Sequence, residues 1–205
     1  MLEARNLACQ KGSLRLFSAL DFVLGAGELL LVQGANGSGK TSLLRLVAGL
    51  SSPSAGALFW QGQPIAALAE DYARALVFIG HANGLKDEFT VVENLEVAQQ
   101  LAGRPATRDA IEGALGAVGL AARLRLPARY LSQGQKRRVA LARLWLAAAA
   151  PLWVLDEPFA ALDTDAVGAL AACLGGHLAR GGVLVLTTHQ DVPIEARRRH
   201  VVGLS

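Results

Sequence analysis

The stretch Gly34-Ala35-Asn36-Gly37-Ser38-Gly39-Lys40-Thr41 decides how the rest of the chain is interpreted. It follows a continuous apolar run, Leu29 to Val32, which is typical of a strand buried on both faces. It precedes a segment, Lys40 to Leu50, whose apolar residues recur at helical spacing. A strand, a glycine-rich loop and a helix in this order form one unit of an α/β fold.

The glycine-rich loop matches the pattern G-x-x-x-x-G-K-[ST] at every fixed position. Glycines let successive backbone N–H groups point at phosphate oxygens, and the next helix adds the positive end of its dipole. Lys40 is expected to reach the β- and γ-phosphates, and the Thr41 hydroxyl to ligate Mg²⁺. A fortuitous glycine turn is the alternative, but the flanking strand and helix favour a phosphate site. The predicted nucleotide-binding residues are Gly34, Ala35, Asn36, Gly37, Ser38, Gly39, Lys40, Thr41 and Ser42.

Two carboxylates, Asp156 and Glu157, follow the apolar run Leu152 to Leu155. Ligands of open α/β sheets lie at the carboxyl ends of the strands, where these two side chains would stand. Asp156 is expected to join Thr41 in the Mg²⁺ shell, and Glu157 to act as the general base on water. Adjacent acids could also begin a solvated loop, but the phosphate loop makes the catalytic interpretation the stronger one.

The segment Leu131 to Gln135 opens a predicted long helix. Ser132 and Gln135 have the spacing of a capping box, which alone would explain them. A helix N-terminus with a free hydroxyl and the N–H of Gly134 is also an anion site. The chain's own phosphates are already served by the glycine-rich loop, so this second site is expected to serve the nucleotide of a second chain.

The remaining periodicity completes an α/β fold. Two further buried strands are predicted at Leu152–Leu155 and Val183–Leu186, with a helix at about Ala166–Ala179 between them. Residues 82–150 have helical segments and no strand signal. We therefore predict one domain, residues 1–205, with a helical subdomain inserted at about 82–150. Its expected helices are Val91–Leu101, Thr107–Val118 and Ser132–Ala149.

Composition excludes several classes of protein. Of the 205 residues, 52% are hydrophobic and 18% charged, which argues against disorder. The net charge of +3 comes without a clustered basic stripe, so no nucleic-acid partner is expected. The basic run Arg197–His200 is interpreted as a solvated face rather than a contact with acidic lipid. Cys9 and Cys173 lack metal-ligand spacing, and no apolar stretch is long enough to span a membrane. The stretch from Met1 to Arg5 has no apolar run after a basic segment, so no signal peptide is expected.

Taken in order, the motifs resemble those of ABC ATPases. They look like the Walker A, signature, Walker B, D-loop and switch-histidine motifs, which here are Gly34–Thr41, Leu131–Gln135, Asp156–Glu157, Ala161–Asp163 and Thr188–His189. The resemblance covers essentially the whole chain. It implies a P-loop NTPase core with an inserted helical subdomain, hydrolysis of ATP with Mg²⁺, and a homodimer with two shared ATP sites.

The resemblance also assigns roles to single residues. Ser132 and Gly134, with Gln135 beside them, would meet the γ-phosphate across the dimer interface, and Asp163 would help to organise that interface. His189 would hydrogen-bond the γ-phosphate and orient Glu157 and the attacking water.

Two positions depart from the ABC pattern. His81 stands where a glutamine is usual after the third core strand, and it is kept as a candidate catalytic residue. The aromatic residue that stacks on adenine is missing from Cys9–Gly12, and Phe17 or Arg15 is a candidate substitute.

Several segments resemble the ATP-binding subunit of the bacterial haem exporter of cytochrome c maturation. They are Gly80–Lys86, Thr90–Leu95, Arg137–Leu146 and Leu186–Gln190. The resemblance implies a peripheral protein on the cytoplasmic face of the inner membrane, integral membrane transporter subunits as partners, and a role in releasing haem-loaded chaperone. We expect those subunits to dock near His81–Phe89.

Four alternatives stay open at this point. They are an ABC exporter for another substrate, a nucleic-acid-linked ABC protein, a regulatory subunit that binds ATP but barely hydrolyses it, and a phosphate-loop kinase. The chain has no room for the fused domains of the second. The intact Glu157 and His189 disfavour the third, and the signature motif would be unused in the fourth.

Overall fold

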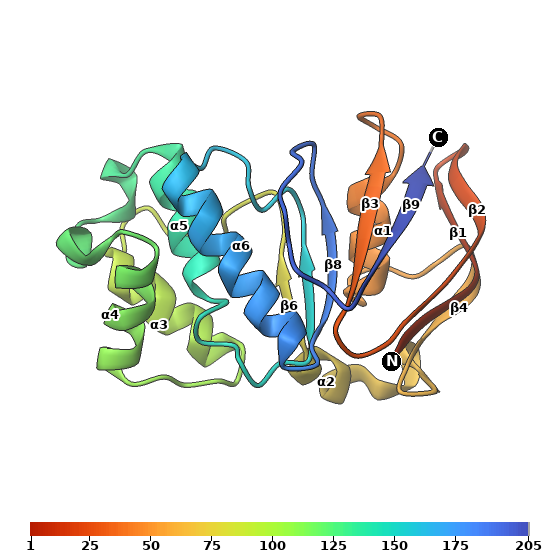
Figure 1. The fold of residues 1–205 in the computed structure, drawn as a ribbon, viewed down its shortest axis with the longest axis horizontal. Helices are drawn as coiled ribbons and strands as arrows, with labels where there is room; N and C mark the ends of the chain where they lie inside the picture. Colours follow the sequence, from red (N-terminus) through yellow and green to blue (C-terminus); the bar gives the residue numbers. More distant parts are fainter. Residues whose placement is uncertain (205) are drawn as a thin grey trace.

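The computed structural model describes residues 1–204, which form two β-sheets and a group of helices (Figure 1). One sheet is parallel, with strand order β6-β7-β8-β3-β9, and the other is antiparallel, with order β2-β1-β4-β5. The elements are β1 (Leu2–Lys11), β2 (Leu14–Leu24), β3 (Glu28–Gly34), α1 (Lys40–Val47), β4 (Ala55–Trp60), β5 (Gln63–Pro64), α2 (Ile65–Ala75), β6 (Leu76–Ile79), α3 (Val91–Leu101), α4 (Arg108–Ala117), α5 (Gln133–Ala142), β7 (Leu152–Leu155), α6 (Thr164–Ala179), β8 (Val183–Thr187) and β9 (Arg198–Leu204).

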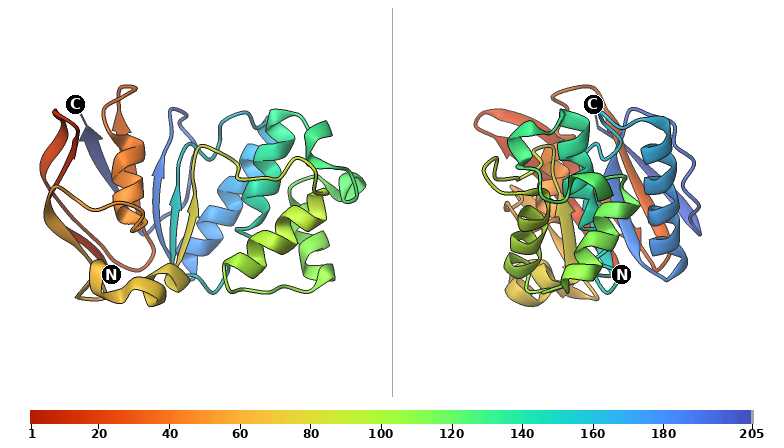
Figure 2. Two further views of the ribbon diagram at one scale, coloured as in Figure 1. Left: turned by 180° about the vertical axis from the view of Figure 1, so that it is seen from behind. Right: turned by 90° about the vertical axis from the view of Figure 1, so that its left-hand side faces the viewer.

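The parallel sheet is buried on both faces, as its apolar strands predict. Along β8, Val183 and Val185 pack into the core that contains α1 and the antiparallel sheet. The alternate residues Leu184 and Leu186 pack into the core that contains α6. Helix α1 therefore lies between the two sheets, and α6 covers the opposite face of the parallel sheet (Figure 2). The predicted α/β class is confirmed.

The chain between β6 and β7 is helical in the described structure. Helices α3, α4 and α5 enclose a third core of their own, which includes Val92, Leu115 and Val139. Thr90 and Thr107 cap α3 and α4 with their side chains, so both helices begin where the sequence predicts.

One predicted helix is too long. The helix expected over Ser132–Ala149 ends at Ala142, and tight i→i−3 turns follow, such as Leu144 N–H to Leu141 O and Ala147 N–H to Leu144 O. Ala142 packs among the helices, whereas Leu144 and Ala147 pack under the parallel sheet. Leu141 also packs under the sheet and Leu146 against the helices, so this segment is shared by the two cores, and tertiary packing overrides the helix propensity of the alanines.

Several elements have weak sequence signals. Strand β4, the short β5 and strand β9 were not predicted from periodicity, and β9 begins within the basic run. β9 is an edge strand that pairs only with β3, so arginines are tolerated along it. Arg197, Arg198 and Arg199 are exposed, but His200 is half-buried and its Nε2 lies 3.0 Å from Glu28 Oε2, so the predicted solvated face is wrong at His200.

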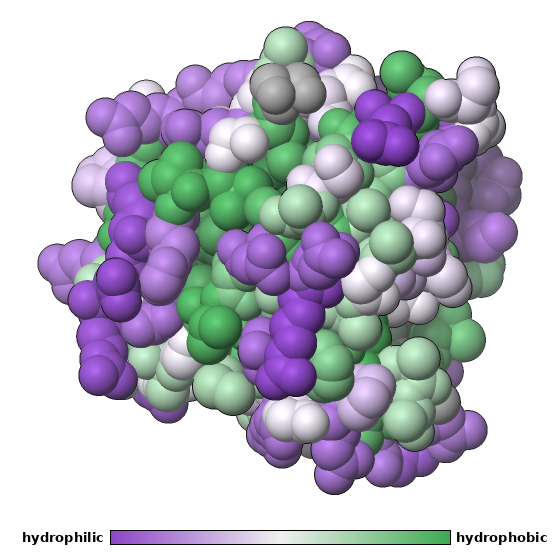
Figure 3. All heavy atoms as spheres, turned by 90° about the vertical axis from the view of Figure 1, so that its right-hand side faces the viewer, coloured by the Kyte–Doolittle hydropathy of each residue, from purple (hydrophilic) through white to green (hydrophobic). Residues whose placement is uncertain are grey.

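The molecular surface is mixed in character. Among residues 1–204, none of the helices combines the length and apolar character needed to traverse a bilayer. At the end formed by β1 and β2, a hydrophobic patch lies among hydrophilic side chains (Figure 3). The exposed apolar residues of β2 include Leu14 and Val23.

A buried histidine joins α6 to the parallel sheet. The His177 ring stacks on the indole of Trp153 with 3.9 Å between ring centroids, and its Nε2 lies 3.2 Å from the Val183 carbonyl oxygen. Burial lowers the pKa of His177 to about 4. The neutral ring with Nε2–H as donor satisfies this arrangement.

This histidine should make the fold sensitive to acid. Its folded-state pKa lies below its unfolded value of about 6.5, so its stabilising contribution is present above pH 6.5 and is lost as pH falls towards 4. The expected loss from this group between pH 7.5 and pH 5 is about 2 kcal/mol of unfolding free energy. Urea unfolding of wild type and His177→Gln at both pH values measures it. The variant should start less stable and change less; equal pH dependence in both proteins would contradict the assignment.

Candidate active site

The carboxyl ends of four parallel strands meet at one edge of the sheet. Strand β3 leads into the glycine-rich loop, β6 into Gly80, β7 into Asp156 and β8 into Thr188. A cavity of about 590 Å³ opens at this edge. It is lined by Lys11, Leu14, Leu16, Asn36, Gly37, Gly39, Lys40, Thr41, Ser42, His81, Asp156, Glu157, Ala160 and His189.

The loop between β3 and α1 requires glycine at two points. Gly34 has φ +152°, and a Cβ there would lie 2.4 Å from the carbonyl oxygen of Leu204 on β9. Gly39 has φ +101° and a Cβ there would lie 3.1 Å from Leu16 on β2. The loop is therefore pressed between β9 and the β1–β2 hairpin, and side chains would force it out of shape.

The loop offers hydrogen-bond donors to an anion. The first bond that closes into α1 runs from Leu43 N–H to Gly39 O, so the amides of Lys40, Thr41 and Ser42 have no intrahelical acceptor. The Lys40 ammonium donates to the carbonyl oxygens of Gly34 (2.8 Å) and Ala35 (3.1 Å). An ammonium has three donors, so one remains for a phosphate oxygen.

Asp156 is held between two hydroxyl groups. Thr41 Oγ1 donates to Asp156 Oδ2, and Thr187 Oγ1 donates to Asp156 Oδ1, both at 2.8 Å. Asp156 is only 2% exposed, so both bonds act in a water-poor setting. The predicted Thr41–Asp156 pair is thus brought together at the cavity wall.

Glu157 has a left-handed backbone conformation, and its carboxylate oxygen Oε1 has no hydrogen-bond partner. Its φ is +48°, its N–H donates to Thr187 Oγ1 at 2.8 Å, and its carbonyl accepts from the guanidinium of Arg137 at 2.9 Å. Its Oε1 is buried without a hydrogen bond and lies 3.4 Å from His189 Nε2. A carboxylate that lacks a protein donor and faces a cavity is suited to accept a proton from water.

The two candidate histidines share a cavity with this carboxylate. His81 follows β6 and His189 follows β8, and both line the same cavity as Glu157. His189 has a 61% exposed side chain, whereas Glu157 has a 21% exposed one. The imidazole at position 81 therefore stands near the phosphate loop, as the motif order predicts.

The far end of the cavity is aliphatic. Leu14, Leu16 and Lys11 of the β1–β2 hairpin line it, whereas the candidate base-stacking residues Phe17 and Arg15 do not. Phe17 instead packs against the core between the sheets. Period-two alternation along β2 explains this, since neighbouring residues point to opposite faces of a strand.

The signature residues lie apart from this cavity. Ser132 caps α5 through a capping box with Gln135: the backbone N–H of Gln135 donates to Ser132 Oγ at 3.2 Å. A Cβ on Gly134 would lie 2.5 Å from the carbonyl oxygen of Ala161. Neither these three residues nor Asp163 lines the cavity around Lys40. Their predicted nucleotide contact therefore remains a prediction about a second chain.

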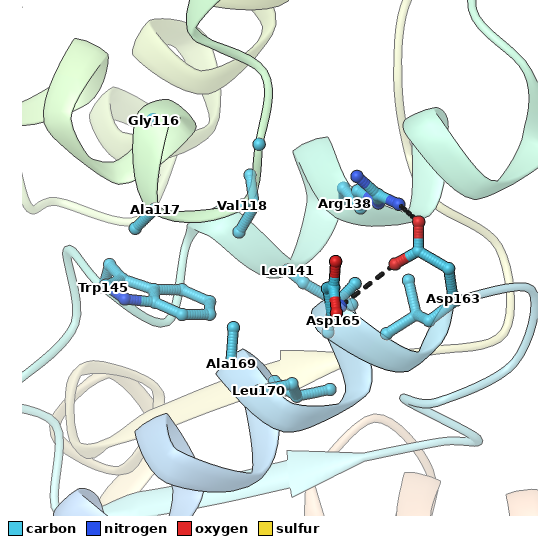
Figure 4. A pocket seen from close by; sticks show the side chains of 13 residues that line it. Gly116, Ala117, Val118, Arg138, Leu141, Trp145, Asp163, Asp165, Ala169 and Leu170 are labelled. Atoms are coloured by element: carbon cyan, nitrogen blue, oxygen red, sulfur yellow. Dashed lines mark hydrogen bonds and ion pairs between the residues drawn. The ribbon is translucent and has the colours of Figure 1, made fainter.

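Asp163 links the signature helix to α6. Its Oδ1 caps α6 by accepting from Ala166 N–H at 3.0 Å, and its Oδ2 pairs with the guanidinium of Arg138 on α5 (Figure 4). The Ala166 amide, followed by the Arg138 charge, lowers the pKa of Asp163. Asp163 and Arg138 both line a cavity of about 350 Å³ between α4, α5 and α6, and Trp145 lies on its opposite side (Figure 4).

Two functional residues were missed by sequence reasoning. Thr187 directly follows the apolar run of β8 and has no motif of its own, although it bonds both Asp156 and Glu157. Arg137 lies in a basic part of α5 that is typical of an exposed helix face, but it is buried. A polar residue at the end of a predicted buried strand was the only available signal for the first.

The close contact at Gly134 predicts a packing cost for alanine there. Gly134→Ala should lower the unfolding free energy by about 1–3 kcal/mol, because the backbone of Ala161 must move. The matched control is Gly113→Ala inside α4, where the new Cβ meets no atom within 4 Å. That control should stabilise the protein by roughly 0.5–1 kcal/mol. Urea denaturation decides; equal effects of the two alanines would contradict the packing.

The fold matches that of solved ATP-binding cassettes. A dimeric structure of a cassette in a post-hydrolysis state, bound to ADP and Pi, superimposes with a TM-score of 0.85. The match covers 100% of this chain and 94% of that chain at 23% identity, so it speaks for the fold alone.

Sequence relatives extend the match to a defined group. The cytochrome c biogenesis ATP-binding export protein CcmA of Dechloromonas aromatica is 54% identical over 196 residues, 96% of each chain. The protein of the same name from Nitrosomonas europaea is 50% identical over 100% of this chain and 96% of its own. The family model described as ABC transporter matches residues 17–160. The chain therefore belongs to the ABC transporter family and, within it, to the cytochrome c biogenesis ATP-binding export proteins.

Proposed function

We propose that the chain is the ATP-hydrolysing subunit of a bacterial ABC transporter, the haem exporter complex of cytochrome c biogenesis. The observation that carries the ATPase is the meeting of the Lys40 loop, the Thr41–Asp156 pair and Glu157 at one cavity. The biogenesis role is supported by the names of relatives that are 54% and 50% identical over nearly the whole chain. Haem as the exported species rests on the sequence resemblance.

The residues of the cavity divide the reaction among them. Lys40 and the amides that open α1 bind the β- and γ-phosphates and neutralise their charge. The Glu157 carboxylate accepts the proton of the attacking water, while His189 and His81 orient that water and the γ-phosphate. Thr187 keeps Asp156 and the backbone of Glu157 in register with each other.

The cavity suits Mg²⁺ bound together with phosphates. The described residues contain no cluster of three His, Cys, Asp or Glu side chains that could hold a metal alone. Mg²⁺ commonly takes one or two protein oxygens and completes its shell with phosphate oxygens and water. The Thr41 hydroxyl and the Asp156 carboxylate would hold it, and when bound the ion offsets charge on the phosphates.

A homodimer gives the signature residues a function. Ser132, Gly134 and Gln135 stand at the exposed N-terminus of α5, away from the chain's own phosphate loop. In a head-to-tail pair, this N-terminus would close the cavity of the second chain and meet its γ-phosphate. The solved cassette of the same fold that holds ADP and Pi is described as dimeric. The Asp163–Arg138 pair would steady the segment that lies at the interface.

The membrane subunits are proposed to dock on the helical subdomain, residues 82–150. Leu101 is 85% exposed and Phe89 39% exposed, and both line a cavity of about 330 Å³ with Lys86 and Arg143. The loop there is built around the buried side-chain amide of Asn94. Its Oδ1 accepts from the Lys86 N–H at 2.7 Å, and its Nδ2 donates to the Lys86 carbonyl at 3.0 Å. A rigid loop with exposed apolar side chains suits a cytoplasmic segment of an integral membrane subunit. Docking there would place the chain at the cytoplasmic face of the inner membrane.

The first test is ATP hydrolysis by wild type and Glu157→Gln, each alone and co-purified with the membrane subunits. Loss of the general base should lower kcat by roughly 100-fold or more, with little change in ATP affinity. Size-exclusion chromatography in Mg-ATP should show a dimer of the variant, because bound ATP is no longer consumed. Absence of turnover in every wild-type preparation, with ATP still bound, would replace this proposal by a regulatory ATP-binding subunit.

A second test addresses the docking surface. Leu101→Asp should reduce co-purification with the membrane subunits at least several-fold, because a carboxylate would enter the apolar contact. The matched control is Leu50→Asp, an exposed leucine that lies outside that cavity. ATP hydrolysis by the isolated chain should be unaffected in both variants. Equal retention of the membrane subunits by both would count against this docking site.

A further inference from the structure

Arg137 is a buried cation whose hydrogen-bond partners are neutral oxygen atoms. It projects from α5, is 4% exposed and ends at the carboxyl edge of the parallel sheet. Its Nη1 donates to the Gly80 carbonyl at 2.8 Å and to Asn83 Oδ1 at 3.4 Å. Its Nη2 donates to the carbonyls of Asp156 at 2.6 Å and Glu157 at 2.9 Å.

Stability alone gives a poor account of this side chain. A buried guanidinium carries a large desolvation cost, and none of its hydrogen bonds goes to a carboxylate. Its Nε is buried without a partner. Burial lowers the pKa of Arg137, and the negative charges of Asp156 and Glu157 offset only part of that. An apolar side chain of similar volume would avoid the cost, so the contacts point to a role in the site.

Those contacts fall on the strained residue that carries the proposed base. Glu157 has φ +48°, which is unfavourable for a residue with a Cβ and persists only where the surroundings impose it. Its N–H is held by Thr187 from β8, and its carbonyl is held by Arg137 from α5. Arg137 also donates to the Asp156 carbonyl, which belongs to the same peptide unit as the Glu157 N–H. The backbone of the proposed base is thus hydrogen-bonded by residues of two elements, β8 and α5.

The hydrogen bonds of Arg137 connect α5 to the residues that follow β6 and β7. Asp156 and Glu157 follow β7 and Gly80 follows β6. Arg137 belongs to α5, which contributes Val139 and Ala142 to the helical core and Leu141 to the core under the parallel sheet. Gly80 is followed directly by His81, the other candidate on the cavity wall. A shift of α5 relative to the sheet would therefore change the support of Glu157 and the start of the His81 loop together.

We propose that Arg137 is a positioning residue for hydrolysis, which holds Glu157 in its left-handed conformation and ties its placement to the position of α5. The proposal rests on the proposed ATPase function and deepens it. The side chain does not touch the nucleotide-binding loop, so it should affect the hydrolysis step and leave ATP binding intact. Movement of the helical subdomain, driven by docked partners or by closure of the dimer, would reach the base through this one side chain.

Kinetics separate positioning from binding. Arg137→Gln, Arg137→Lys and the charge-matched surface control Arg125→Gln are compared with wild type in the preparation that hydrolyses ATP. Arg137→Gln should lower kcat on the order of 10- to 100-fold with KM for ATP within about threefold, because misplacing a base by about 1 Å has that effect. Arg137→Lys keeps the charge and can reach some of the carbonyls, so its kcat should lie between the two. Arg125→Gln should match wild type.

A second readout does not depend on activity. Hydrogen exchange of the Glu157 amide, which donates to Thr187, should be faster in Arg137→Gln than in wild type, while exchange within α1 stays the same. Wild-type kcat in Arg137→Gln, or equal losses of kcat, ATP affinity and thermal stability, would overturn the proposal. Unchanged exchange at Glu157 would overturn it as well. If wild type does not hydrolyse ATP at all, the proposed function fails, and the exchange measurement still decides whether Arg137 holds Glu157.

Discussion

The hydrogen bonds on Asp156 are the constraint on which the site depends. Thr41 opens α1, Asp156 ends β7 and Thr187 ends β8, and two bonds of 2.8 Å tie these three elements at one buried carboxylate. Parallel strands make this possible, because their carboxyl ends share one edge of the sheet. With both oxygens engaged and almost no exposure, the carboxylate is fixed in place before any nucleotide binds, so little reorganisation is needed when phosphate charge arrives.

The phosphate-binding residues and the signature residues are held in place by different interactions. The phosphate loop and the acids sit on a sheet that is packed on both faces by large apolar cores. The signature residues begin a helix within a smaller core, where their hydroxyl and amide groups are already used in a capping box. Polar bridges such as Arg138–Asp163 and Arg137 with the β7 carbonyls join the two parts. Such a division lets one part move relative to the other without disturbing the rigid sheet.

Much of the fold and site follows from local sequence. The buried strands and the loop at Gly34–Thr41 have strong patterns, and their adjacency follows from the parallel topology. The early end of α5, the strand character of β9 and the burial of Arg137 could not be predicted, because each is set by which distant surface the segment meets. Which residues of β2 line the cavity also could not be predicted, because strand register decides whether Leu14 and Leu16 or the candidates Arg15 and Phe17 face inward.

The two departures from the ABC pattern lie outside the hydrogen-bond network on Asp156. His81 lies in the exposed segment after β6, and the hairpin residues Leu14 and Leu16 line the cavity. Neither position touches the hydroxyl–carboxylate network on Asp156, so either can vary without loosening it. An aliphatic wall still buries a base but lacks the quadrupole of an aromatic ring and forms no directional stack. The Lys40 ammonium and the free amides that open α1 offer charge-assisted hydrogen bonds to an anion, which are stronger than the contacts that an aliphatic wall can make.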